Sequence, residues 1–197
     1  MYSCTHGLPP AYRVTAGRPR RHDPDRKARI IDATLIAIAR HGVGATTHRL
    51  IAAEADVPLG SLTYHFDSLD DLRRQAFELH ARRMSATYEA HFHGVRSRAQ
   101  LIDAVTDLVH QAAGVEIGDW AIAYELYLAA LRDPELRTVT ESWMRTSRAV
   151  LEQFIDPATA RGLDALIEGL VVHKVLSTAP ASRAWTRRTV ARMVGST

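Results

Sequence analysis

The sequence predicts an all-α fold of about nine to ten helices, and three observations support it. Apolar residues recur at helical spacing through most of the chain, and no run alternates apolar and polar residues as a half-buried strand would. The pairs Asp133-Pro134 and Asp156-Pro157 each place a capping acid before a proline, which is typical of helix starts. The stretch Thr46–Phe66 is typical of two short helices joined by a tight turn. We expect an N-terminal three-helix domain and a C-terminal helical bundle.

Local chemistry explains each part of the stretch Thr46–Phe66. The Thr47 hydroxyl can accept a hydrogen bond from the first turn of a helix. Asp56 tolerates the left-handed backbone of a tight turn, and Pro58 disfavours helix at the residue before it, so the first helix ends there. A second helix then turns Leu62 inward, and its small hydroxylated side chains suit phosphate oxygens and base edges. The alternative is an ordinary pair of helices buried in a helical protein.

The remaining helices are marked by caps and by apolar residues at helical spacing. Ser68 and Asp71 form a capping-box-like start. The helices are expected over about 68–94, 101–109, 120–131, 133–154, 156–176 and 182–194.

Length and composition limit the number of domains and the cellular compartment that we expect. A chain of 197 residues can form one large or two modest domains. It has no uncharged apolar stretch of about 18 residues or more, as a membrane span would need. The first residues, MYSCTHGLPPAY, lack the charged start and apolar segment of a secretory signal. Because Cys4 is the single cysteine, no internal disulfide can form, and we expect a cytoplasmic protein.

Positive charge is concentrated near the N-terminus. Residues 1–29 carry seven Lys and Arg against two Asp, a net charge of +5 within a chain of net charge +3. Gly17-Arg18-Pro19-Arg20 resembles the core of an AT-hook, which lies in a narrow minor groove. We expect residues 1–22 to form a disordered basic arm that contacts DNA phosphates through Arg18, Arg20 and Arg21. A solvated tail without a partner is the alternative.

The residues on both sides of Thr46–Phe66 extend the pattern, with DRKARIIDATLIAIARHG before it and DSLDDLRRQAF after it. Over residues 26–75 the chain resembles the TetR (tetracycline-repressor-like) family of bacterial transcription regulators. The matching positions are Ile31, Ala33, Leu35, Gly42, Thr46, Thr47, Ile51, Ala52, Ala55, Val57, Gly60, Ser61, Leu62, Tyr64, His65, Phe66, Ser68 and Leu72. The resemblance implies a helix-turn-helix DNA-binding domain over residues 23–68 and a ligand-binding and dimerisation domain over residues 69–197.

The chain departs from the family pattern at three positions. Asp56 replaces the usual turn glycine, Thr63 replaces a common aromatic residue, and Leu69 replaces a frequent lysine. Between Thr46 and Phe66 the one full positive charge is Arg49. We therefore expect the basic arm to contribute part of the affinity for DNA.

The resemblance implies a sequence-specific transcription regulator, a homodimeric repressor that a ligand releases from a palindromic double-stranded DNA operator. An activator of the same family and, in a different class, a helical protein-binding adaptor without DNA binding are the alternatives. The expected contacts to the DNA backbone are Thr47, Arg49, Tyr64 and His65. The expected base contacts are Leu59, Ser61 and Thr63.

The segment WAIAYELYLAAL, which begins at Trp120, is the candidate wall of an effector site. Trp120, Tyr124 and Tyr127 share one helical face, for which ordinary core is the alternative. The segment is apolar nearly all round, so we expect it to be buried on all sides. The resemblance implies a C-terminal cavity for a small ligand of unknown identity, hydrophobic or aromatic in character. Glu125 can face a cationic ligand, although we favour a structural salt bridge, and His173 is a weaker polar candidate.

The helix expected from Gly162 to Leu176 is too apolar for one core face. The resemblance implies that it joins a four-helix dimer interface, for which a buried central helix of a monomer is the alternative. Its stripe is Leu163, Leu166, Ile167, Leu170 and Val171.

Catalytic motifs are missing from the sequence. It contains no G-x-S-x-G elbow, no H-E-x-x-H, no phosphate-binding P-loop and no dinucleotide-binding glycine pattern. The ten histidines are scattered, and His91 and His93 point to different faces of a helix. We expect no enzymatic activity, no metal site and no cofactor.

Overall fold

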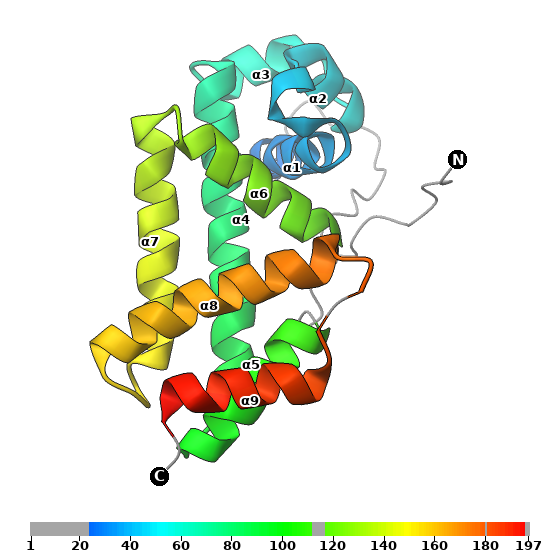
Figure 1. Cartoon of the computed structure of the whole chain (residues 1–197). Helices are drawn as coiled ribbons and strands as arrows, with labels where there is room; N and C mark the ends of the chain where they lie inside the picture. Colours follow the sequence, from blue (N-terminus) through cyan, green and yellow to red (C-terminus); the bar gives the residue numbers. More distant parts are fainter. Residues whose placement is uncertain (1–23, 112–116, 180, 196–197) are drawn as a thin grey trace. The chain divides into compact units, whose positions relative to one another are not determined.

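The computed structural model describes residues 24–111, 117–179 and 181–195, and all their regular structure is helical (Figure 1). The nine described helices are α1 (Arg26–Ala45), α2 (His48–Glu54), α3 (Gly60–His65), α4 (Leu69–Phe92), α5 (Arg98–Gln111), α6 (Ile117–Ala130), α7 (Pro134–Leu151), α8 (Pro157–Leu176) and α9 (Arg183–Val194). The predicted all-α fold is confirmed. None of these helices is long and apolar enough to cross a membrane.

The chain divides into two compact units. Among the described residues, the first unit comprises 24–81 and 117–140, and the second comprises 82–111, 141–179 and 181–195. Helices α4 and α7 therefore contribute residues to both units, and α6 belongs with the N-terminal helices.

The core of the first unit lies where α1, α2, α3 and the start of α4 meet. Its residues recur at the helical spacings that the sequence shows, so each helix presents one apolar face. They are Ile30, Ala33, Ala37, Ile51, Ala52, Ala55, Leu62, Phe66 and Leu72. Helix α6 packs against α1 within the same unit.

The turn between α2 and α3 has the predicted geometry. The Thr47 hydroxyl caps α2 by accepting a hydrogen bond from the Leu50 N–H at 3.3 Å. Asp56 adopts a left-handed backbone with φ of 51°, and α3 begins two residues after Pro58. A further capped start precedes α4, where the Asp71 N–H donates to the Ser68 hydroxyl at 3.0 Å.

The second unit is built around α5, α8 and α9, which pack against one another. Asp156 caps α8 by accepting from two backbone N–H groups, and Ser182 caps α9. An added Cβ at Gly162 on α8 would meet the terminal methyl group of Met193 on α9, which is the end of a flexible side chain that can move aside. Arg187 on α9 also pairs with Asp103 on α5 at 2.7 Å.

Two expectations from the sequence are wrong in detail. Helix α7 ends at Leu151 instead of near Phe154, because the chain tightens into short-range turns before Pro157, which disfavours helix at the residue before it. Helix α6 is not buried on all sides. Ile122 and Leu126 face inward, whereas Leu128 lies on another face of the helix and is 55% exposed.

Candidate functional site

Helix α3 and the residue before it present several of the predicted DNA-contact side chains to solvent. Tyr64 is 84% exposed and Leu59 is 47% exposed, while Leu62 and Phe66 fix the opposite face in the core. Thr63 is also exposed, and its hydroxyl donates to the Gly60 carbonyl at 3.2 Å. A short helix that is anchored from behind leaves its outer side chains free to meet another surface.

The other predicted DNA-contact residues near this face differ in how exposed they are. Thr47 and Arg49 are exposed at the start of α2, and Ser61 and His65 are half-buried on α3. The arm candidates Arg18, Arg20 and Arg21 lie outside the described residues.

Lys27 is a cation that the sequence reading did not assign to this face. Its Nζ lies 5.4 Å from the centroid of the Phe66 ring, at the end of α3, and the side chain is exposed. In sequence Lys27 was only one of several basic residues, and no local pattern pairs it with a residue 39 positions later. Glu54, an acid near the reading helix, is paired with Arg40 at 2.7 Å.

The junction between α1 and α2 is held by side chains from two other helices. The Glu125 carboxylate of α6 accepts a hydrogen bond from the Val43 N–H at 2.9 Å. The Arg73 guanidinium of α4 donates to the Val43 carbonyl at 2.9 Å and to the Thr46 carbonyl at 2.7 Å. Glu125 thus binds backbone in place of the salt bridge that the sequence suggested, because Gly42 at φ of 75° turns the end of α1 towards it.

The predicted aromatic face of α6 is present. The Trp120 and Tyr124 rings stack with centroids 6.2 Å apart, and the Tyr124 and Tyr127 centroids lie 6.4 Å apart. Trp120 is 8% exposed, and its indole N–H is buried without a hydrogen-bond acceptor among the described residues. His80 on α4 is fully buried in the same unit, with its Nδ1 3.9 Å from Asp119. The assignment of this face to a ligand stays a prediction.

The second unit contains a polar cluster that the sequence reading missed. The Asp164 carboxylate on α8 lies 3.8 Å from the Arg148 guanidinium on α7, and its side chain is 13% exposed. Burial raises the pKa of Asp164 to about 6, against the opposing effect of Arg148. Burial also raises the pKa of the Tyr88 phenol on α4, and the charges of Asp164 and Glu168 add to that effect.

Asp164 and Glu168 are one helical turn apart, which was the available sequence signal for this cluster. The Tyr88 hydroxyl is buried without a hydrogen-bond partner among the described residues, and the Tyr88 ring lies 4.8 Å from that of Phe92. We refer to Tyr88, Phe92, Arg148, Asp164 and Glu168 as the Asp164 cluster.

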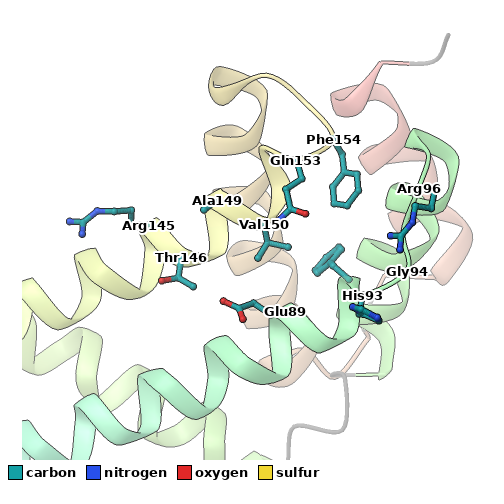
Figure 2. A pocket seen from close by; sticks show the side chains of 11 residues that line it. Glu89, His93, Gly94, Arg96, Arg145, Thr146, Ala149, Val150, Gln153 and Phe154 are labelled. Carbon is teal, nitrogen blue, oxygen red and sulfur yellow. The ribbon is translucent and has the colours of Figure 1, made fainter.

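The surface pockets of the second unit include the following two. One of about 490 Å³ runs between the end of α4 and α7, where Glu89 lies between the helices and Arg145 is turned away from it (Figure 2). The Phe154 ring is at the far end of this pocket (Figure 2). The other pocket, of about 250 Å³, includes the exposed His173 and also His110, whose Nε2 lies 2.9 Å from the Thr186 hydroxyl.

The predicted dimer stripe on α8 is divided by its packing. Leu163, Ile167 and Val171 are between 0% and 6% exposed, so they already belong to the core of the second unit. Leu166 and Leu170 are half-buried. Another α8 face is left uncovered by the residues that the structure describes. It includes Gly169, whose missing Cβ would meet nothing within 4 Å, and Leu176, which is 72% exposed.

Two family models match the chain over the regions described above. Residues 30–76 match the bacterial regulatory proteins of the tetR family, and residues 96–196 match the tetracyclin repressor-like C-terminal domain. The chain belongs to the TetR family. This TetR-family chain is therefore a helix-turn-helix, DNA-binding transcription regulator, and the family is one of regulators, not of enzymes.

Solved structures agree with this assignment. SCO7518 of Streptomyces coelicolor A3(2), described as a transcriptional regulator, is 43% identical and has a TM-score of 0.83, with 88% of this TetR-family chain and 100% of that chain covered. EbrR, described as a multidrug binding protein and solved with imidazole, is 34% identical and has a TM-score of 0.73, with 89% and 98% covered. The regulator BetI of Vibrio campbellii is 25% identical over 162 residues, which are 77% of this chain and 81% of BetI.

Proposed function

We propose that this chain is a repressor that binds a palindromic operator as a homodimer and leaves it when a small ligand binds. The DNA-binding part of this proposal rests on the exposed outer face of α3. Tyr64 is 84% exposed there, and Leu62 and Phe66 hold the helix from behind. Exposed side chains on a fixed helix are suited to reading base edges in the major groove.

The roles of individual side chains follow from their positions. Tyr64, Thr47 and Arg49 are proposed to contact phosphates, together with His65. Leu59, Ser61 and Thr63 are proposed to read bases, with the apolar side chains against thymine methyl groups. Lys27 adds a phosphate contact beside α3, because it is exposed and lies over Phe66.

The basic arm, residues 1–22, is proposed to supply part of the electrostatic attraction that α3 lacks. The DNA-reading face has few cations, with Arg49 and Lys27 as its described examples. Each phosphate contact contributes to the salt dependence of binding. Deletion of residues 1–22 is therefore expected to weaken operator binding and to reduce the slope of log affinity against log salt concentration. Unchanged affinity and slope would remove the arm from the proposal.

A homodimer is proposed because a two-fold protein matches a two-fold operator. The uncovered α8 face with Gly169 and Leu176 supports this arrangement, as does Trp185 on α9, which is 45% exposed. Half-buried Leu166 and Leu170 can be covered further by a partner. A monomeric mass in light scattering at micromolar concentration would refute the pairing.

Ligand release is proposed from two observations. EbrR is described in complexes with ethidium, proflavin and malachite green at 33% to 37% identity to this chain. Within this chain, the aromatic face of α6 is on the same helix as Glu125, which holds the α1–α2 junction. A ligand that moves α6 would therefore disturb the Glu125 contact at the α1–α2 junction, which holds α2 and α3 in place. A complete switch requires the ligand to prefer the released state by about 5.5 kcal/mol.

The direct test is a binding titration of the full chain with DNA fragments that flank its own gene. We expect a salt-dependent shift that Tyr64→Ala and Ser61→Ala weaken by about tenfold each, or about 1.4 kcal/mol. Glu152→Gln, an exposed site in the second unit, is the matched control and should bind as the wild type does. Absence of any shift at low salt would favour the protein-binding adaptor. A reporter whose expression falls when the gene is deleted would instead identify an activator.

A further inference from the structure

We infer that the surface pocket of about 250 Å³ in the second unit binds a small organic acid in its carboxylate form. Residues of α5, α8, α9 and the segment between α8 and α9 line this pocket, and it shares no described residue with the aromatic face of α6. Its walls combine positive charge, hydroxyl groups and apolar side chains. The inference goes beyond the proposed function and does not rest on it.

The walls of the pocket carry positive charge without an acid to balance it. None of the described residues that line the pocket is acidic. Lys174, near the end of α8, is half-buried there and has no ion-pair partner among the described residues. The first turn of α9 also lines the pocket, and backbone N–H groups at a helix start add partial positive charge. This environment favours an anion over a cation.

His110 on α5 is exposed to the same positive charge. Burial lowers the pKa of His110, and the charges of Lys174 and Arg183 lower it further, against the opposing effect of Asp107. Arg183 is itself paired with Asp107, so Lys174 is the cation of this group that lacks a counter-ion among the described residues. A carboxylate bound beside Lys174 would supply that counter-ion.

Two hydroxyl groups among the lining residues can donate hydrogen bonds to a carboxylate. The Ser177 hydroxyl oxygen accepts from the Ala179 N–H at 3.1 Å, which leaves its proton for a ligand. Thr186 is 1% exposed, and its hydroxyl lies 2.9 Å from the His110 Nε2. When Nε2 carries the proton, His110 donates to the Thr186 oxygen, and the Thr186 proton is left for a ligand. Hydrogen bonds to an ionised acceptor are stronger than those to a neutral one.

The apolar walls limit the size and character of the ligand. Val109, Leu170 and Trp185 supply an aliphatic surface and one aromatic ring. The volume of about 250 Å³ is below the range of about 300 to 1,000 Å³ for pockets that take drug-sized ligands. The pocket therefore suits a small acid with one ring or a short chain. Leu170 and Trp185 are also part of the surface proposed for the dimer, so a bound acid would lie beside a partner subunit.

The test compares benzoate with benzamide, which has almost the same shape and no charge. Isothermal titration calorimetry of the full chain is run at neutral pH in a buffer without phosphate or organic acids. Benzoate should bind tighter than benzamide by about tenfold or more, because only benzoate can form an ion pair with Lys174. Equal affinity for the two compounds, or no binding of either, would overturn the inference.

Inorganic phosphate separates an organic acid from a simple anion. Titrated in the same way, phosphate should bind more weakly than benzoate, because it gains nothing from the apolar walls. Phosphate that binds as tightly as benzoate would reject an organic acid as the ligand.

Variants of Lys174 locate the site. Lys174→Gln should weaken benzoate binding by about tenfold, whereas Lys174→Arg keeps the charge and should retain most of the affinity. Arg188→Gln is the matched control, because Arg188 is an exposed cation of α9 that is not among the lining residues. Circular dichroism checks that each variant is folded. A folded Lys174→Gln that binds benzoate as tightly as the wild type would overturn the site, and if that variant does not fold, the comparison of benzoate with benzamide still decides.

The His110 ring gives a readout that a merely structural effect would not move. In an NMR titration of the full chain against pH, bound benzoate should raise the pKa of His110, because a negative charge beside the ring favours the imidazolium. Lys174, Arg183 and Asp107 act on this ring with and without the ligand, so the two titrations are compared at the same salt concentration. An unchanged pKa at saturating benzoate would place the acid outside this pocket.

The outcomes separate this inference from the proposed function. A chain that binds benzoate through Lys174 but binds no operator would refute the repressor and leave the acid site standing. A chain that binds its operator but takes benzoate no tighter than benzamide would refute the acid site and leave the repressor standing.

Discussion

The Glu125 carboxylate accepts a hydrogen bond from the Val43 N–H at 2.9 Å, across 82 positions of sequence. This contact ties α6 to the end of α1, directly before the helix-turn-helix. Arg73 binds the carbonyl groups of Val43 and Thr46 from α4, so the junction is held by an acceptor and by a donor. The position of α2 and α3 therefore depends on a side chain from α6.

Glu125→Ala should lower the free energy of unfolding by about 1.5 to 3 kcal/mol, the range for a hydrogen bond to a charged group. It should also weaken operator binding, since the α1–α2 junction loses the hydrogen bond from the Val43 N–H to Glu125. Glu125→Gln is the matched control, because its amide oxygen can still accept from Val43. Chemical denaturation and operator titration of the three proteins measure both effects. If Glu125→Ala unfolds and binds operator as the wild type does, the Glu125–Val43 contact does not hold the DNA-binding helices in place.

Of the two glycines near the end of α1, Gly42 should tolerate replacement by alanine less well than Gly44. Its φ of 75° is unfavourable for other residues, and an added Cβ would lie 3.1 Å from the Glu125 Oε1. Gly42→Ala should therefore destabilise the fold by about 1 to 2 kcal/mol. Gly44→Ala is the control, because a Cβ there would meet nothing within 4 Å. Similar melting temperatures for the two variants would contradict this reading.

Lys27→Met should weaken operator binding and lower the salt slope by about 1, as expected when one phosphate contact is lost. Methionine keeps an apolar stem against Phe66 while removing the charge. Arg145→Met, which changes a cation in the second unit, is the control for the change in net charge. Affinities measured at several salt concentrations give the slopes. An unchanged slope for Lys27→Met would show that Lys27 does not touch phosphate.

Asp164 should make the fold less stable as the pH rises. Its pKa is about 6 in the folded chain against an ordinary value of 3.8, so the folded state holds the proton more tightly. Between these two values unfolding releases a proton, and the stability contributed by this group is lost as the pH rises through about 6. Asp164→Asn should therefore raise the melting temperature more at about pH 7.5 than at about pH 4.

The exposed carboxylate variant Glu152→Gln is the control for this pH series and should show a much smaller difference between the two conditions. Arg148 lies beside Asp164, and the charges of Asp164 and Glu168 both act on Tyr88, so the comparison is made in the same buffer and salt throughout. A stabilisation by Asp164→Asn that is larger at the lower pH would have the wrong sign and would reject the assignment.

Features set by neighbours in sequence were predictable, and features set by distant pairs were not. The Thr47 cap, the left-handed Asp56 and the inward Leu62 depend on a few adjacent residues, and the structure confirms them. Helical spacing shows which face of a helix is apolar but not which neighbour covers it. For this reason, the sequence could not separate the residues of α8 that meet the chain's own core, such as Leu163 and Ile167, from those left uncovered.

The same limit applies to the polar sites. Glu125 was recognised as an isolated charge, but its partner is a backbone N–H that carries no sequence signal. The Asp164 cluster joins residues from α4, α7 and α8, and only its Tyr88–Phe92 and Asp164–Glu168 spacings are local. The roles of the predicted DNA and ligand residues stay predictions.

The uneven burial of the three tryptophans gives the chain an optical reporter of its own. Trp120 and Trp143 are 8% and 7% exposed, so both rings are already shielded from solvent. Trp185 on α9 is 45% exposed, and any partner that covers it will shift its emission to shorter wavelength. Intrinsic fluorescence followed along a dilution series can therefore report association at α9 without a label.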